Sequence, residues 1–225
     1  MLPACLVPFV LVFIKLNRNS GSSSLDDGNI YAKATKMKTG IILTGGKNTR
    51  MGTNKAFLAM EGERLIDRTV RIYRDVFDEV ILVTNEPHLY YDIDVTLVTD
   101  LIKDRGPLMG IYTGLFFAAS DPVFFAACDM PFLSSGFIRF LLEQSRDAEI
   151  VVPETAEGFQ PLHAIYSKSC MGTIQRLLSQ DKLKVTGFYK GMKLKIIGAD
   201  DIRRFDPDGR MFLNVNTPEE YSKIR

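Results

Sequence analysis

The stretch IILTGGKNTRMGTNK, residues 41–55, joins an apolar strand to a loop that is rich in glycine and basic side chains. The apolar run 41–43 predicts a strand, and Gly45 and Gly46 break it. Paired glycines let the backbone turn tightly and approach a ligand with no Cβ in the way. Successive backbone N–H groups in such a turn can form a concave nest for an anion.

Three basic side chains, Lys47, Arg50 and Lys55, follow these glycines within nine residues, together with a third glycine, Gly52. Arginine offers phosphate oxygens a planar fork, and lysine offers a compact charge. The stretch is neither a Walker A loop nor a GxGxxG motif, because no Gly-Lys-Ser/Thr closes it. A turn leading into a solvated basic loop is the plainer interpretation, but three cations in so short a span favour a cradle for a triphosphate.

Composition bounds the class of protein. The chain has 225 residues, 46% hydrophobic and 24% charged, which is typical of one globular domain with a real core. Its net charge is +1, from 28 basic and 27 acidic residues. So balanced a charge gives no electrostatic footprint for nucleic acid, so we expect no nucleic-acid partner.

The cysteines and histidines predict neither a disulfide framework nor a zinc site. Cys5, Cys128 and Cys170 are widely scattered and form no CxxC pair. Only two histidines are present, and His163 lies in an apolar run, where a packed side chain is expected rather than a catalytic one. We therefore predict a reducing, cytoplasmic compartment.

Residues 1–36 differ in composition from the rest and are predicted to be an N-terminal extension to a domain over 37–225. The apolar run Leu2–Leu16 contains two prolines and is too short for a spanning helix, so no stable membrane insertion is expected. It also lacks the positive n-region of a secretory signal. A linker-like stretch, NRNSGSSSLDDGN, follows. Three interpretations stay open: a misassigned start with Met37 the true one, a poorly ordered appendage, or a weak membrane anchor.

From Met37 onward, predicted strands and helices alternate. Strands are expected over 41–43, 79–84, 93–99, 122–127, 149–152, 163–166, 193–197 and 211–213. Helices are expected over 64–77, 108–120, 134–146, 169–180 and 218–224, from their apolar spacing. The alternation predicts an α/β fold, with a mostly parallel sheet built from βαβ units. The run 122–127 is apolar throughout, as expected of a central strand that is covered on both faces.

Polar or glycine-rich signals follow four successive predicted strands: the loop from Gly45, then Asn85, Asp100 and Asp129. In an open parallel sheet, ligands bind beyond the carboxyl ends of the strands. Asp129 is a candidate Mg²⁺ ligand, because hard cations take carboxylate and phosphate oxygens together. A turn or helix-capping role before Pro131 is the alternative. Asn85 and Asp100 are turn candidates too, although an amide at a strand end can read a base edge.

Two further segments carry candidate residues. Gly106 and Gly110 flank Pro107 at a helix start, and Gly110 would allow close packing against a neighbour or a base. Near the C-terminus, Asn214 and Asn216 precede a Thr-Pro helix cap, which does not account for two asparagines. With no Ser/His/Asp set and no redox motif, these features favour phosphoryl-type chemistry, in which positioning and electrostatics matter most.

Together these motifs resemble the molybdenum cofactor guanylyltransferases, the MobA family. Leu43-Thr44-Gly45-Gly46, Arg50-Met51-Gly52 and Lys55 are similar to the L-x-G-G…R-M-G…K signature of nucleotidyltransferases. Cys128-Asp129-Met130-Pro131-Phe132, Gly106-Pro107-Leu108-Met109-Gly110-Ile111 and Phe212-Leu213-Asn214-Val215-Asn216-Thr217-Pro218-Glu219 extend the match, in order, from Met37 to the end. The first 36 residues lie outside it.

The resemblance implies a Rossmann-like open sheet with helices on both faces, as in nucleotide-diphospho-sugar transferases. It also implies transfer of GMP from GTP-Mg²⁺ to the terminal phosphate of Mo-molybdopterin, with release of pyrophosphate. Molybdoenzyme-maturation proteins are further candidate partners. The implied GTP-binding residues are Leu43, Thr44, Gly45, Gly46, Arg50, Lys55, Asn85, Asp100, Gly106, Gly110 and Asp129. The implied catalytic residues are Lys55, Asp129, Asn214 and Asn216, with Asp129 holding Mg²⁺.

The loop departs from the family pattern at two positions. Asn54 stands where an Asp usually precedes the lysine, and Thr53 stands where a second glycine often follows Arg-Met-Gly. Neither departure removes a principal ligand. Two rivals stay open: a cytidylyl or sugar-phosphate nucleotidyltransferase sharing this loop, and a nucleotide-binding module without catalysis. Retention of Lys55 and Asp129 argues against the second.

Overall fold

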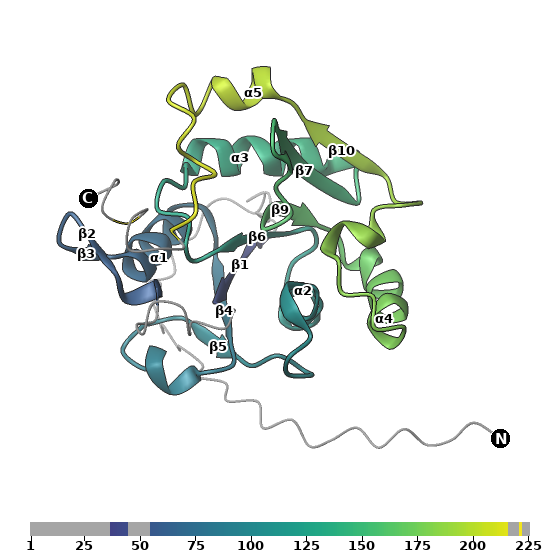
Figure 1. The fold of residues 1–225 in the computed structure, drawn as a ribbon, viewed down its shortest axis with the longest axis horizontal. Coiled ribbons are helices and arrows are strands. Elements are labelled where there is room, and N and C mark those ends of the chain that lie inside the picture. The colour runs from purple at the N-terminus through teal and green to yellow at the C-terminus, as the bar shows by residue number, and fades with distance from the viewer. Residues whose placement is uncertain (1–36, 45–54, 216–220, 222–225) are drawn as a thin grey trace, which may run out of the picture.

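The computed structural model describes residues 37–44, 55–215 and 221, and its core is one twisted sheet between two layers of helices (Figure 1). The strands of the sheet are β1 (Thr39–Thr44), β4 (Glu79–Thr84), β5 (Thr96–Val98), β6 (Val123–Ala127), β7 (Ile150–Thr155), β8 (Gly158–Phe159), β9 (His163–Tyr166) and β10 (Leu194–Ile197). Their spatial order is β10-β7-β9-β6-β1-β4-β5, with β8 paired to β7. The helices are α1 (Leu65–Val76), α2 (Gly106–Phe117), α3 (Ser135–Gln144), α4 (Met171–Ser179) and α5 (Ala199–Arg203).

The predicted fold class, an α/β protein with an open, mostly parallel sheet, is confirmed. β1 is parallel to both β4 and β6, β4 is parallel to β5, and β7 is parallel to β10. The exceptions are β9, which runs antiparallel to its neighbours β6 and β7, and β8. All residues of β1 and β6 are buried, as expected of strands covered on both faces.

Helices cover both faces of the sheet, and successive residues of β1 face opposite layers. Ile42 packs in an apolar cluster with α1 and α3, whereas Ile41 and Leu43 pack in a second cluster with α2 and α4. This alternation follows from the two-residue period of a strand. In Figure 1, α1 and α3 accordingly lie on one side of the sheet, and α2 and α4 on the other.

The predicted elements are found with three differences. β5 is shorter than the predicted strand 93–99. A two-stranded hairpin, β2 (Ala59–Met60) with β3 (Glu63–Arg64), the short strand β8 and the short helix α5 were not predicted. Residues 211–213 are not a strand, and that prediction was wrong. The N–H groups of Arg210 and Met211 donate to the carboxylate of Asp206, at 2.8 and 2.9 Å, so the chain turns here instead of entering a sheet. The predicted helix 218–224 lies, except for Tyr221, outside the described residues.

The parallel strands bring their carboxyl ends to one edge of the sheet. Leu43 pairs with Val83 of β4 and with Ala127 of β6, and Val83 pairs with Val98 of β5. The strand order β6-β1-β4-β5 therefore aligns the residues that follow these strands. Adjacent strands lie about 4.8 Å apart, so this row spans roughly 15 Å.

No helix in the described part of the chain is both long and apolar enough to cross a membrane. Cys128 and Cys170 are buried and free, and Cys5 lies outside the described residues. His163 is fully buried among aromatic rings, as predicted from its apolar surroundings. Its burial lowers its pKa to about 3, so the ring stays neutral at ordinary pH.

Candidate nucleotide-binding and transfer site

Asn85 and Asp100 form a polar pair just beyond the ends of β4 and β5. Asn85 Nδ2 donates a hydrogen bond to Asp100 Oδ2 at 2.8 Å. The other oxygens of the pair, Asn85 Oδ1 and Asp100 Oδ1, are buried and have no hydrogen-bond partner. Burial raises the pKa of Asp100, and the side chains of Asn85 and Thr113 oppose that shift. Buried acceptors without a partner are costly, so two of them in one hydrogen-bonded pair mark a place where a ligand's donors would stabilise the protein.

The orientation of the Asn85 amide follows from its partner. An ionised carboxylate can only accept hydrogen bonds, so the Asn85 NH₂ group must face Asp100. The amide oxygen is then left as an acceptor. The pair therefore leaves two buried acceptors, and no donor, without a hydrogen bond.

Gly110 of α2 lies against this pair and against the end of β1. A Cβ placed on Gly110 would be 3.1 Å from Leu43 Cδ2 and 3.8 Å from Asp100 Oδ1. The close packing predicted for Gly110 is therefore found. Gly106, the first residue of α2, is exposed and has φ +63°, a conformation that glycine adopts without strain. Its neighbour Arg105 contacts Asp181 in the turn after α4.

Thr44 closes β1, and its side chain is already engaged. The Thr44 hydroxyl donates to the carbonyl oxygen of Val83 at 3.1 Å, and the residue is buried. Leu43 is also buried, and its carbonyl oxygen accepts from the N–H of Cys128 at 3.1 Å. Both residues therefore shape the sheet edge, and contact between their side chains and a nucleotide stays a prediction.

The charges of Lys55 and Asp129 both affect the pKa of the buried Cys128 thiol, although Lys55 is far from Cys128 in the sequence. The negative charge of Asp129 adds to the effect of burial in raising the pKa of Cys128, and the positive charge of Lys55 opposes it. Both charged groups are therefore near this thiol. Ala56, next to Lys55, is fully buried in the same apolar cluster as Cys128 and Met130. The short 3-10 helix Lys55–Phe57 is thereby anchored beside the end of β6.

Asp129 is not the cap of the helix that follows it. That position belongs to Ser134, whose hydroxyl accepts from the N–H of Phe137 at 3.3 Å, as predicted for Ser134. The helix-capping alternative for Asp129 is thereby excluded. The backbone carbonyl of Asp129 accepts from the N–H of Val215 at 3.0 Å.

That hydrogen bond brings Asn214 to the same edge of the sheet. Asn214 is exposed, whereas its neighbour Val215 is 1% exposed and packs with Met60 and Leu65. A backbone anchored on both sides thus presents the Asn214 side chain to solvent beside the Asp129 loop. Four predicted site residues, Gly45, Gly46, Arg50 and Asn216, lie outside the described residues.

A divalent metal would find a suitable donor in Asp129. Among residues 37–44, 55–215 and 221, no group of three or more His, Cys, Asp or Glu side chains gathers to hold a metal by itself. Mg²⁺ in nucleotide-dependent enzymes is usually held by one or two carboxylates together with substrate phosphates. A carboxylate near a lysine at the edge of a predicted triphosphate cradle fits that pattern.

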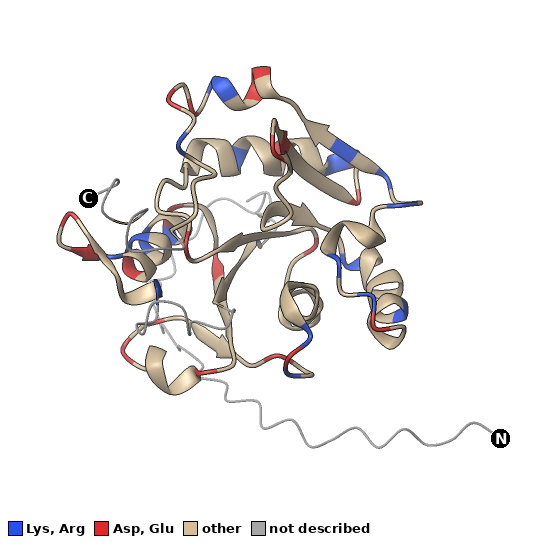
Figure 2. Ribbon diagram, viewed as in Figure 1, with Lys and Arg blue, Asp and Glu red and all other residues tan. Residues whose placement is uncertain are grey.

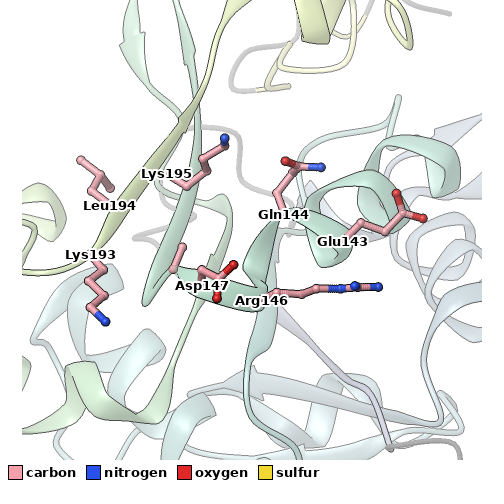
Figure 3. Close-up of a pocket in the computed structure, with 8 residues that line it drawn as sticks. Glu143, Gln144, Arg146, Asp147, Lys193, Leu194 and Lys195 are labelled. Carbon is pink, nitrogen blue, oxygen red and sulfur yellow. The ribbon is translucent and has the colours of Figure 1, made fainter.

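One cavity in the described part of the chain lies away from this edge (Figure 3). It is lined by the end of α3 and the start of β10, through Glu143, Gln144, Arg146, Asp147, Ala148, Lys193, Leu194 and Lys195. These residues lie at the amino ends of β7 and β10, opposite the edge that carries Asp129. Its acidic and basic lining residues are all exposed.

Acidic and basic side chains are interspersed over the described elements (Figure 2). The ion pairs that they form are mostly on the surface, such as Arg71 with Glu63 at 2.9 Å and Arg74 with Asp94 at 3.1 Å. Surface pairs of this kind contribute little to stability. Their mixture of signs agrees with the balanced composition.

Two features of the site were not found from the sequence. Thr113 of α2 is buried, lies next to Asp100, and accepts from the N–H of Leu101 at 3.2 Å. A threonine inside an apolar helix carries no distinct signal. Asp206 holds the turn that leads to Asn214. Its signal was the sequence Asp206-Pro207-Asp208-Gly209, which is typical of a turn.

Comparison with known families gives a match over most of the sheet. Residues 40–191 match the family described as the MobA-like NTP transferase domain. The molybdenum cofactor guanylyltransferase of Desulfosudis oleivorans is 39% identical over 187 residues, which cover 82% of this chain and 93% of that protein.

Two solved structures share the fold. The molybdopterin-guanine dinucleotide biosynthesis protein A of Archaeoglobus fulgidus superposes with a TM-score of 0.73 at 23% identity, covering 83% of this chain and 96% of that one. Rv0371C of Mycobacterium tuberculosis, in a complex with manganese, superposes with a TM-score of 0.63 at 18% identity, covering 84% and 98%. At these identities the likeness establishes the architecture alone.

Proposed function

Because this chain belongs to the MobA-like NTP transferase family and is therefore a nucleotidyltransferase, we propose that it transfers GMP from GTP to the terminal phosphate of Mo-molybdopterin. Pyrophosphate leaves, and the product is the guanine dinucleotide form of the cofactor. The names of similar proteins support this choice of substrates. The observation that carries it is the partly buried Asn85–Asp100 pair, with its two buried acceptor oxygens that have no partner.

Guanine matches that pair better than the other bases. Its Watson–Crick edge presents N1–H and N2–H₂, two adjacent donors, whereas adenine and cytosine present one donor beside one acceptor. Two acceptors, Asn85 Oδ1 and Asp100 Oδ1, would therefore satisfy guanine and would leave an acceptor of adenine or cytosine facing an acceptor. Gly110 packs closely against Leu43 and lies beside Asp100 Oδ1, so α2 closes one side of this pair.

The order of the strands then sets the direction in which the nucleotide would lie along the sheet edge. With the base at the ends of β4 and β5, the triphosphate would extend over the end of β1 toward β6, where Lys55 and Asp129 lie. Lys55 would bind phosphate oxygens as a point charge. The glycine-rich loop after Thr44 would supply backbone N–H groups.

Asp129 would hold Mg²⁺ against the triphosphate, on a backbone fixed by the buried strand β6. Mg²⁺ would neutralise charge that develops on the leaving pyrophosphate. Asn214 would orient the reacting phosphates from the other side, since its backbone is tied to the Asp129 loop. We place this reaction in the cytoplasm, in keeping with the reducing compartment predicted from the cysteines.

Two measurements on the full chain test the proposal. At a nucleotide concentration about 100-fold above its Kd, GTP should stabilise the fold by about 2.7 kcal/mol, which raises Tm by roughly 5–10 °C. ATP and CTP should give much smaller shifts. Equal shifts for all three would refute base recognition by Asn85 and Asp100. Pyrophosphate release from GTP that depends on Mo-molybdopterin would support catalysis, and its absence would favour a module that binds nucleotide without transfer.

A further inference from the structure

The segment that carries Asn214 is held by a turn between Asp206 and Met211. The two carboxylate oxygens of Asp206 accept from the N–H groups of Arg210 and Met211, at 2.8 and 2.9 Å. The N–H of Gly209 donates to the carbonyl oxygen of Asp206 at 3.2 Å. Gly209 has φ +66°, which lets the chain reverse so that both N–H groups reach one carboxylate.

Beyond this turn, the chain contacts the Asp129 loop at two points. The guanidinium of Arg210 lies over the ring of Phe132, 3.9 Å from its centroid. The N–H of Val215 donates to the carbonyl oxygen of Asp129 at 3.0 Å. Phe132 is three residues after Asp129, so the two contacts align 210–215 along 129–132.

Two side chains anchor the same segment: Phe212, which is partly buried, and Val215, which is buried. Phe212 packs edge-on against the rings of Phe137 and His163. Val215 packs with Met60 of β2 and Leu65, the first residue of α1, and Phe132 packs against this group. Asn214 is exposed between Phe212 and Val215. Its position beside the Asp129 loop therefore depends on where the turn at Asp206 begins.

We infer that Asp206 is a positioning residue for nucleotidyl transfer: by closing the turn, it sets the register of Asn214 beside Asp129. This inference rests on the proposed function and extends it to a residue that contacts no substrate. The distance of Asp206 from Asn85 and Asp100, which lie two and three strands from β6, separates its effect from base binding. Its loss should therefore lower kcat and leave the affinity for GTP unchanged.

Asp206→Ala removes both acceptors and tests this assignment. A displacement of about 1 Å in a reacting group can cost on the order of 100-fold in rate. We expect kcat for pyrophosphate release, per folded molecule, to fall about 10- to 100-fold, with KM for GTP within about twofold of its original value. Asp206→Asn keeps one acceptor and should recover part of the rate. Asp201→Ala is the matched control, because it removes a surface carboxylate that pairs with Arg204 at 3.1 Å in the neighbouring helix.

Amide hydrogen exchange gives a readout that does not depend on activity. In Asp206→Ala, the Val215 amide should exchange at least about 10-fold faster, as its opening becomes easier. The Cys128 amide, which donates to Leu43 O, should be unchanged. Unchanged Val215 exchange, or a normal kcat per folded molecule in Asp206→Ala, would overturn the inference. If the unaltered chain released no pyrophosphate, the proposed reaction would fall, and Val215 exchange would still decide whether Asp206 holds the segment.

Discussion

The base end and the transfer end of this sheet edge are built in different ways. At the base end, Asn85 and Asp100 follow neighbouring strands, are partly buried, and bond directly to each other. At the transfer end, Lys55, Asp129 and Asn214 come from three distant segments. Their backbones are joined by apolar packing and by one backbone hydrogen bond, from Val215 to Asp129. Recognition of the base can thus rest on two rigid strand ends, whereas transfer requires segments far apart in sequence to converge.

Loss of Asp129 should have the largest effect, confined to the transfer end. In Asp129→Ala, GMP transfer should fall by about 10²–10³, because a preorganised electrostatic element is removed from the transition state. Single-turnover pyrophosphate release with saturating GTP, Mg²⁺ and molybdopterin measures it. Circular dichroism and melting should change little.

Asp147→Ala is the control for Asp129, since Asp147 is an exposed carboxylate at the opposite edge of the sheet. Near-normal transfer by a folded Asp129→Ala enzyme would remove Asp129 from the mechanism. A loss of about 1 kcal/mol in stability with full turnover of the folded fraction would assign it a turn role instead.

Asp100→Asn should separate binding from stability at the base end. Two facing amides leave only one acceptor without a partner, so one NH₂ group would meet a guanine donor. The affinity for GTP should fall about 10- to 100-fold, the loss of a hydrogen bond to a charged group. Calorimetric titration with GTP and ATP measures this loss, and Asp104→Asn, on the exposed loop that follows, is the control.

The same variant should make the free protein more stable at neutral pH. Burial raises the pKa of Asp100 in the folded state, so its contribution to stability is full below the unfolded pKa of about 3.9 and is lost as pH rises through the folded pKa. At pH 7 the ionised carboxylate is therefore unfavourable, and the neutral amide removes that cost. A lower Tm for Asp100→Asn at pH 7, or an unchanged affinity for GTP, would contradict this account.

A smaller effect, on stability, is expected at His163, whose ring packs against Phe212 near the transfer end. Burial lowers its pKa to about 3, below the unfolded value of about 6.5. Its neutral form therefore stabilises the fold above pH 6.5, and this contribution is lost as pH falls toward 3. Between pH 6.5 and pH 5 the loss should reach about 2 kcal/mol, at about 1.4 kcal/mol per pH unit.

His163→Leu, of similar volume, should abolish that part of the acid sensitivity, and urea unfolding at pH 7 and pH 5 would show it. The variant also removes two ring nitrogens that are buried without a hydrogen-bond partner. His88→Gln is the control, because His88 is exposed. An unchanged dependence of stability on pH in His163→Leu would contradict the prediction.

The local patterns of the sequence determined the elements and the candidate residues. Alternation of apolar runs and helical spacing identified the strands that became β1, β4 and β6, because burial on both faces requires continuous apolar side chains. Ser134 was identified as a helix cap for a local reason, the hydrogen bond from Phe137. Asn85, Asp100 and Asp129 were chosen because each follows a strand, and the parallel sheet aligned them.

Only the tertiary structure decided which of these residues meet, since that depends on strand order and not on position along the chain. Asn85 and Asp100 are 15 residues apart, and their hydrogen bond forms because β4 and β5 are neighbours. The reversed direction of β9 and the turn at Asp206 were likewise set by nonlocal pairing and by a side chain that captures backbone N–H groups. The Asp206 carboxylate takes backbone N–H groups that a strand at 211–213 would need for pairing. The apolar pattern of the sequence does not show that a side chain competes for these donors.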